Sequence, residues 1–437
     1  MFKKLIHRLK GELALSLART FAARGVVVVG GMLLYVILGR LYGAAGMGAF
    51  ALAQSLYLGA AILARQGMDN ALMRYVGQDP ASSAVGAYLR LAVARGAVFS
   101  TIAALSLLIS SQEMSEWFHS PMLAEVLPGL ALAIPPFTIS LVIGGFMKGL
   151  GKPAAAALLE NGSISLLGCL IVLVLEALWS TGIENAGLAI AIAAWIVLVM
   201  GAVQVKYHMN QRISVKEKDP LLLLENFKSS AHTFFVLGTT QFVQQTVFVL
   251  IIGALLGENE LGLFKAAERA AFLISFVLLV LNTVLPPRFS KLYYAGDMNG
   301  LKKIVRQGVL VGLVLATPLL LVLFIAAERV MNVYGEGFEQ GAMLLRIFAI
   351  GYFINVISGS FELLLGMTGY ERIVRNISLF CCTLGVVILL TIVPHFGAIG
   401  AALSFTLLLV VRNLLGVYYV RIKLGFWGLT FFRSCSH

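Results

Sequence analysis

The chain alternates between long apolar stretches and short polar connections over its whole length. Each apolar stretch has about 20 residues or slightly more, and at ~1.5 Å per residue such a helix crosses the ~30 Å hydrocarbon core of a bilayer. The pattern therefore predicts an all-α polytopic membrane protein with twelve transmembrane helices. The predicted spans are residues 13–39, 47–73, 84–110, 121–147, 153–177, 186–207, 230–256, 262–287, 304–326, 340–366, 373–394 and 397–422.

The composition predicts that the chain contains no soluble domain. Hydrophobic residues make up 59% of the 437 positions and charged residues only 12%. A soluble domain carries roughly 25% charged residues, so most of this surface must face lipid. Of the four cysteines, three lie inside predicted helices and Cys435 lies in the C-terminal tail. This placement predicts neither a disulfide framework nor a metal site, and we expect no cofactor.

The net charge of +12 is distributed between the predicted spans rather than on one basic module. Nucleic acid is therefore not an expected partner. On one predicted side of the membrane, the connections contain only two basic residues, Arg40 and Arg329. Nearly all other Lys and Arg residues of the connections lie on the opposite side. Because Lys and Arg are retained in the cytoplasm, this alternation predicts that both termini are cytoplasmic.

A weak internal repeat relates the two halves of the chain. At a shift of 214 residues, LYGAAGMGAFALAQS (41–55) matches LLGENELGLFKAAER (255–269), which aligns Gly43 with Gly257. Six spans per half give both halves the same direction through the membrane, as in transporters built from parallel repeats. We therefore expect an N-lobe (1–207), a cytoplasmic linker (208–229) and a C-lobe (230–437), related by a pseudo-two-fold axis around a central cleft.

Several charged residues of the first half fall inside predicted spans, where each costs about 2.5–3.5 kcal/mol at the bilayer centre. Arg24 lies ~16 Å into the first span and has no carboxylate one turn away, so we expect it to face a water-filled cavity. Arg65 and Asp69 are one turn apart, which allows either a structural ion pair or a place in that cavity. Arg95 lies in the third span.

In the second half, Lys265, Glu268 and Arg269 share neighbouring turns of the eighth span, and Glu362 lies in the tenth. Alternatively, Lys265, Glu268 and Arg269 lie at the level of the outer lipid headgroups instead of facing the cavity. Carboxylates are fewer than cations inside the spans, so the sequence predicts a positively charged interior.

The seventh predicted span contains three glutamines near its centre. Gln241, Gln244 and Gln245 are spaced i, i+3 and i+4, which places them on one face of an α-helix. Such a face can hydrogen-bond neighbouring helices or the hydroxyl and phosphate oxygens of a substrate.

Three motifs carry a resemblance to a known family: LGRLYGAAGMGAFALAQS (38–55), RQGMDNALMRYVG (65–77) and GSFELLLGMTGYERIVRN (359–376). With the twelve-span count, they make the chain similar to polysaccharide or O-antigen flippases, Wzx-like members of the multidrug/oligosaccharidyl-lipid/polysaccharide (MOP) exporter superfamily. The resemblance implies an undecaprenyl-pyrophosphate-linked oligosaccharide as cargo and spans one, two, seven and eight around the cleft. The lipid II flippase of this superfamily has two further C-terminal helices that the present sequence lacks.

The function implied is translocation of that lipid from the cytoplasmic to the periplasmic leaflet of the bacterial inner membrane, without enzymatic chemistry. Partners would be membrane lipids and other glycan-assembly proteins, and coupling to H⁺ or Na⁺ is left open. We expect substrate contacts from Arg24, Arg65, Arg95, Gln241, Gln244, Gln245, Lys265 and Arg269, and ion coupling through Asp69, Glu268 or Glu362.

Two other functions remain as alternatives. A cation/drug antiporter of the same superfamily would need an acidic cleft, whereas the predicted interior is basic. A membrane-embedded glycan polymerase or ligase would place catalytic groups in long external loops, whereas the external connections predicted here are about 15 residues or shorter.

Overall fold

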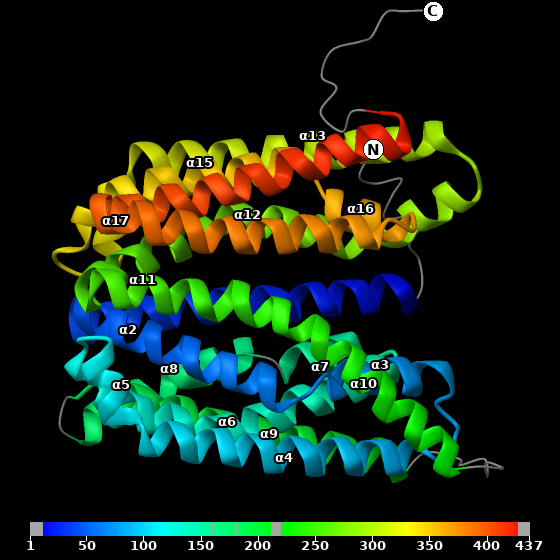
Figure 1. The fold of residues 1–437 in the computed structure, drawn as a ribbon, viewed down its shortest axis with the longest axis horizontal. Coiled ribbons are helices and arrows are strands. Elements are labelled where there is room, and N and C mark those ends of the chain that lie inside the picture. The colour runs from blue at the N-terminus through cyan, green and yellow to red at the C-terminus, as the bar shows by residue number, and fades with distance from the viewer. Residues whose placement is uncertain (1–11, 160, 180–181, 211–219, 427–437) are drawn as a thin grey trace, which may run out of the picture. The chain divides into compact units, whose positions relative to one another are not determined.

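The computed structural model describes residues 12–159, 161–179, 182–210 and 220–426. Every regular element in these segments is a helix, and none is a strand (Figure 1). The prediction of an all-α fold is confirmed.

The chain forms two compact units, the first ending at Glu258 and the second beginning at Asn259. The first contains α2 (Glu12–Ala64), α3 (Met68–Gln78), α4 (Val85–Ile109), α5 (Ser111–Trp117), α6 (Pro121–Gly149), α7 (Pro153–Leu158), α8 (Asn161–Leu178), α9 (Glu184–Asn210), α10 (Pro220–Phe242), η1 (Val243–Val247) and α11 (Phe248–Leu256). The second contains α12 (Glu258–Tyr294), which begins at the last residue of the first unit, and α13 (Met298–Ile325), α14 (Ala327–Met331), η2 (Asn332–Tyr334), η3 (Phe338–Gly341), α15 (Ala342–Ser358), α16 (Phe361–Met367) and α17 (Glu371–Leu424). The division into lobes at 208–229 stays a prediction.

Eight helices of the described residues are long and apolar enough to cross a membrane. Two of them belong to α2 and α17, which are each bent at a glycine. α17 contains the last two predicted spans, and α2 contains the first and most of the second. The protein is thus a multi-pass membrane protein, while the count of twelve remains a prediction. The eight are Val28–Ala64, Val85–Ile109, Pro121–Gly149, Pro153–Leu178, Glu184–Asn210, Met298–Ile325, Phe338–Met367 and Glu371–Leu424.

The glycines aligned by the internal repeat have the same unusual backbone conformation. Gly43 has φ 68° and ψ −170°, and Gly257 has φ 80° and ψ 175°. This region is accessible essentially only to glycine. The chain therefore makes the same corner at matching positions of the two repeats, which supports the repeat inferred from the sequence.

Alanine at either corner should destabilise the protein by about 1–3 kcal/mol, because a Cβ disfavours this conformation although no atom lies within 4 Å of it. Thermal unfolding of purified Gly43→Ala and Gly257→Ala would measure the loss. Gly31→Ala is the matched control, since its site is equally open but lies in regular helix. Equal unfolding temperatures for all three variants would contradict the assignment of strain to the corners.

Several predicted spans are not continuous α-helices, and the span predicted at 340–366, for example, is divided between α15 and α16. The span predicted at 47–73 is interrupted between α2 and α3, where Gln66 (φ 48°) and Gly67 (φ 70°) are left-handed. The span predicted at 230–256 contains the π-helix η1. The expected common face of Gln241, Gln244 and Gln245 assumed regular α-helical turns, and η1 interrupts that regularity.

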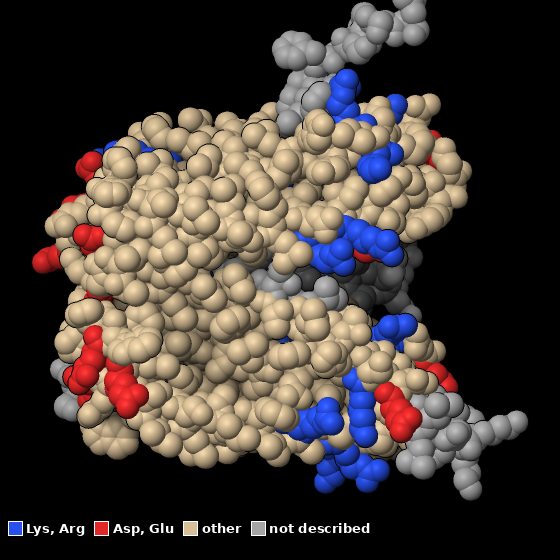
Figure 2. All heavy atoms as spheres, viewed as in Figure 1, with Lys and Arg blue, Asp and Glu red and all other residues tan. Residues whose placement is uncertain are grey.

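Charge and apolar surface separate along the helices of each unit. Figure 2 shows most of the visible Lys and Arg atoms of each unit toward one end of its helices, Asp and Glu atoms at both ends, and uncharged surface between. Large hydrophobic side chains of the spans are exposed, including Val98, Leu170 and Val314 at 57%, 60% and 68%. Continuous apolar surface of this kind is what a bilayer covers.

Candidate functional site

An ion pair lies at the break between α2 and α3. The Arg65 guanidinium donates to Asp69 Oδ2 at 2.8 Å, and both side chains are 13% exposed. The predicted pairing of these residues is confirmed, but it spans a left-handed turn instead of a continuous helix. Asp69 Oδ1 is buried and has no hydrogen-bond partner in the part of the chain that the structure describes.

Neighbouring helices pack closely against this break. A Cβ added to Gly67 would lie 2.5 Å from the Ala231 carbonyl oxygen of α10, and one added to Gly145 of α6 would lie 2.2 Å from the Asp69 carbonyl oxygen. Farther along α3, the Tyr75 and Ser230 hydroxyls are 3.0 Å apart. The position of the ion pair is thus set by backbone contacts from two other helices of the first unit.

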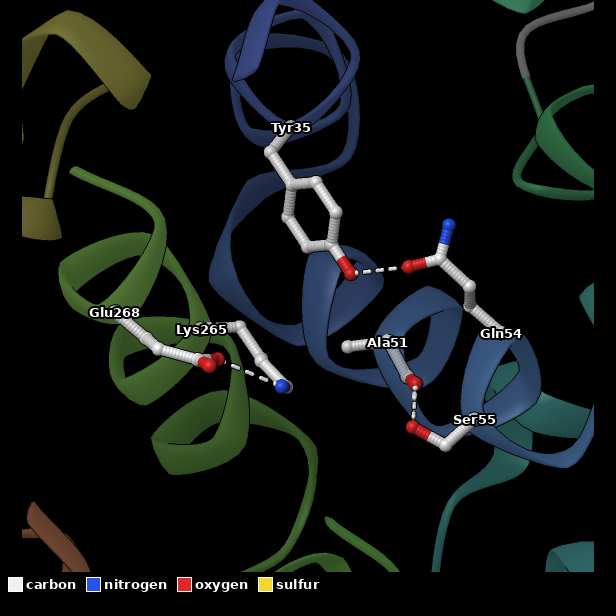
Figure 3. Close-up of polar contacts among 6 residues, drawn as sticks. All are labelled: Tyr35, Ala51, Gln54, Ser55, Lys265 and Glu268. Atoms are coloured by element: carbon white, nitrogen blue, oxygen red, sulfur yellow. Dashed lines mark hydrogen bonds and ion pairs between the residues drawn. The ribbon is translucent and has the colours of Figure 1, made fainter. Parts of the chain in front are cut away.

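In the second unit, α12 carries an ion pair within one helical turn (Figure 3). Lys265 Nζ donates to Glu268 Oε2 at 2.7 Å, and the two side chains are 9% and 19% exposed. Lys265 is among the buried residues of the protein, and its depth in the membrane stays a prediction. Arg269, the next residue of the predicted set, is half-buried.

The interior of α2 contains polar contacts that the sequence analysis did not single out. The Tyr35 hydroxyl donates to Gln54 Oε1 at 2.7 Å, and the Ser55 hydroxyl donates to the Ala51 carbonyl oxygen (Figure 3). The Thr246 hydroxyl of η1 donates to the Ser55 carbonyl oxygen at 3.3 Å. The π-helix is therefore joined to α2 by a buried hydrogen bond.

A third ion pair, Glu362 of α16 with Arg412 of α17, lines a polar cavity of about 230 Å³ within the second unit. Its other polar lining residues are Asn282, Asn355, Ser360 and Asn413. The asparagines were not among the residues expected from the sequence. A usable signal was available, since each is an amide inside a predicted span.

The remaining predicted site residues divide into two groups. Arg95 is exposed on α4. The side chains of Arg24, Gln241, Gln244 and Gln245 lie outside the described residues. The predicted roles of all these residues in binding remain predictions.

Three cations of the predicted spans have a carboxylate partner from their own unit: Arg65, Lys265 and Arg412. In each pair the acid lies three or four residues away or on an adjacent helix. The expected excess of cations inside the spans stays a prediction. No group of three or more His, Cys, Asp or Glu side chains among the described residues could hold a metal ion.

Comparison with protein families decides the classification. A model of the family described as "Polysaccharide biosynthesis protein" matches residues 18–293, well over half of the chain. The chain belongs to the polysaccharide biosynthesis protein family. A second model, MatE, matches residues 236–391. No curated protein matches the chain in sequence.

Solved structures extend the family assignment to the fold. A lipid II flippase MurJ in an inward closed conformation superposes with a TM-score of 0.73 at 11% identity, covering 92% of this chain and 87% of that one. An inward-facing multidrug resistance MATE family transporter of the MOP superfamily gives 0.68 at 14% identity, covering 91% and 94%. A MOP superfamily transporter from Pyrococcus furiosus gives 0.59 at 13% identity, covering 94% and 95%. This polysaccharide biosynthesis family member thus has the fold of MOP superfamily transporters.

Proposed function

We propose that the protein is a flippase that moves an undecaprenyl-pyrophosphate-linked oligosaccharide from the cytoplasmic to the periplasmic leaflet of the bacterial inner membrane. One observation carries the proposal: a chain of the polysaccharide biosynthesis family has the fold of membrane transporters. A glycan-pathway protein with this fold has the means to move a glycan carrier across the bilayer, and O-antigen or lipopolysaccharide assembly would use such a step.

The cationic side chains supply the chemistry for a pyrophosphate headgroup. Guanidinium groups bind phosphate oxygens through bidentate, charge-assisted hydrogen bonds. We assign this role to Arg65 and Arg269, and from the sequence also to Arg24 and Arg95. Lys265 would add a point positive charge. Export of an anion from a cell with a negative interior is also favoured, by about 2.3 kcal/mol per charge per 100 mV.

The ion pairs give a physical reason for coupling to a cation. A pyrophosphate that takes Arg65 from Asp69 leaves a buried carboxylate without its partner, which costs several kcal/mol. Uptake of H⁺ or Na⁺ by Asp69 would remove that cost. Two other carboxylates are placed to take up a cation in the same way: Glu268, which pairs with Lys265, and Glu362, which pairs with Arg412.

The predicted orientation, with both termini in the cytoplasm, follows from the separation of basic and acidic residues along the helices. It places the basic ends at the leaflet where the lipid-linked glycan is made. Other glycan-assembly membrane proteins would then deliver and receive the lipid.

The test is reorientation of a polyprenyl-pyrophosphate-linked oligosaccharide in proteoliposomes that contain the purified protein. We expect the glycan to become accessible to an externally added lectin faster than in protein-free vesicles. Equal rates in the two preparations would refute the flippase function.

The match of residues 236–391 to the MatE model favours a second function, export of drug-like cations. Efflux of a fluorescent lipophilic cation from the same proteoliposomes, without glycan movement, would establish that alternative.

Arg269→Ala should slow glycan reorientation about 10-fold or more, because loss of one charge-assisted contact is worth roughly 1.5–3 kcal/mol. Arg329→Ala is the control, since Arg329 is exposed in α14 and belongs to no predicted contact. Both variants are compared at equal reconstituted amounts. Equal rates for Arg269→Ala and the unmodified protein would remove Arg269 from the substrate path.

A further inference from the structure

The polar cavity of the second unit lies among α12, α15, α16 and α17. Its volume is about 230 Å³, and its floor includes the turn at Gly359 and Ser360 that separates α15 from α16. At ~30 Å³ per molecule in the liquid, this volume holds roughly seven or eight waters, far more than the one or two buried waters that usually satisfy an internal polar group. The cavity is large enough for a small organic ligand.

Hydrogen bonds hold the polar walls of the cavity in place. The Ser360 hydroxyl donates to Asn282 Oδ1, which joins α12 to the turn before α16. Asn413 Nδ2 donates to Asn355 Oδ1 at 3.1 Å and to the Leu409 carbonyl oxygen at 2.7 Å. Asn355 Nδ2 lies 3.4 Å from the Ser275 hydroxyl, to which it donates. The amides are thus oriented before any ligand arrives.

One buried acceptor in this wall lacks a donor. Asn413 is 1% exposed, and its Oδ1 has no hydrogen-bond partner in the segments that the structure describes. A buried acceptor without a donor is destabilising, and native proteins seldom keep one without a reason. This oxygen has almost no accessible surface, so it belongs to the wall of the cavity and is not itself a contact point for a bound molecule.

The charges that line the cavity oppose ionic ligands of either sign. Glu362 and Arg412 pair with one another, so their charges cancel. A cation in the cavity would meet the guanidinium, and an anion would meet the carboxylate. Both side chains are partly exposed, at 38% for Glu362 and 30% for Arg412, so the cavity is not sealed.

The remaining wall is apolar, formed by side chains that include Leu278, Phe361 and Leu363. Amides, a hydroxyl and an ion pair beside an aromatic and aliphatic wall match a molecule with a polar rim and an apolar face. Sugar rings have this character, because their hydroxyl groups both donate and accept while their C–H faces are apolar.

We propose that this cavity binds one neutral, hydroxyl-rich sugar ring, with the amide of Asn355 and the Glu362–Arg412 pair as its polar contacts. The ring would be one unit of the glycan that the protein moves, held apart from the pyrophosphate. The identity of the ligand rests on the proposed function, but the existence of the site does not.

Saturation-transfer NMR on the purified full-length protein in nanodiscs tests the proposal. The probes are N-acetylglucosamine and galactose, with glycerol as the polyol that represents a phospholipid headgroup. We expect a weak, saturable signal from at least one hexose that excess glycerol does not displace. No hexose signal, or displacement by glycerol, would overturn the assignment to a sugar.

Leu363→Trp should fill the cavity and abolish the hexose signal. The matched control is Leu379→Trp on α17, where the replaced side chain is 48% exposed and lies outside the cavity. Should Leu363→Trp fail to fold, Asn355→Leu removes a polar contact while keeping the same branched side-chain shape, and it should weaken the signal. Retention of the full signal in a folded cavity variant would refute the site.

The assay also separates this proposal from the flippase function. Hexose binding with no glycan reorientation would leave the site standing and reject the flippase. Reorientation with no hexose binding would reject the site alone.

Discussion

Asp69→Ala will destabilise the protein by roughly 3 kcal/mol, and Arg65→Ala by a similar amount, whereas the double variant will lose less than the sum. The reason is that removal of one partner leaves a largely buried charge without compensation, while removal of both eliminates the charge altogether. Each side chain is only 13% exposed, and their atoms are 2.8 Å apart. Thermal or denaturant unfolding of the four proteins gives the coupling energy of the pair.

The Glu328–Arg346 pair provides a matched control within the same chain. Its atoms are 3.8 Å apart, and Glu328 is 70% exposed. Pairs of this kind contribute about 0–1 kcal/mol, so we expect no more than that from the corresponding cycle. Additive losses for Arg65 and Asp69 would mean that the pair does not stabilise the fold, and the proposed exchange of Arg65 between Asp69 and pyrophosphate would lose its energetic basis.

The second large effect concerns the contact between α6 and α3. Gly145→Ala should destabilise the protein by about 1–3 kcal/mol, because the new Cβ would lie 2.2 Å from the Asp69 carbonyl oxygen and 2.7 Å from its Cα. These are backbone atoms, so α3 itself must move. The shift would also separate Asp69 from Arg65, and we expect glycan transport to fall with stability.

Gly144→Ala is the control for this substitution. The neighbouring glycine lies in the same helix, but its new Cβ would meet only the Ala156 carbonyl oxygen, at an ordinary contact distance of 3.7 Å. We expect no loss, or a gain of up to ~1 kcal/mol from helix propensity. Similar unfolding temperatures for the two variants would show that α6 and α3 are not as closely packed as described.

Part of the candidate site could be predicted from local sequence alone. Arg65 and Asp69 are four residues apart, which allowed an ion pair, and the pair forms, although across a left-handed turn. Lys265 and Glu268 are three residues apart within α12 and also pair. Within a continuous helix such as α12, this spacing by itself holds two side chains within reach of one another.

Other features could not be read from spacing. The break at Gln66 and Gly67 is stabilised by the close approach of α10, whose residues lie more than 160 positions away in the chain. The polar cavity is assembled from α12, α15, α16 and α17. No local pattern reports which of many polar residues will converge, because convergence depends on how the helices pack.

The apolar periodicity, the low charge content and the alternation of basic and acidic connections determined by themselves that this protein is a multi-span helical membrane protein. They could do so because transfer of a helix into lipid depends on its own composition and length. The pairing of Glu362 with Arg412, the interruption of several spans and the polar cavity were decided only by tertiary structure, since each depends on distances between side chains or backbones of different helices.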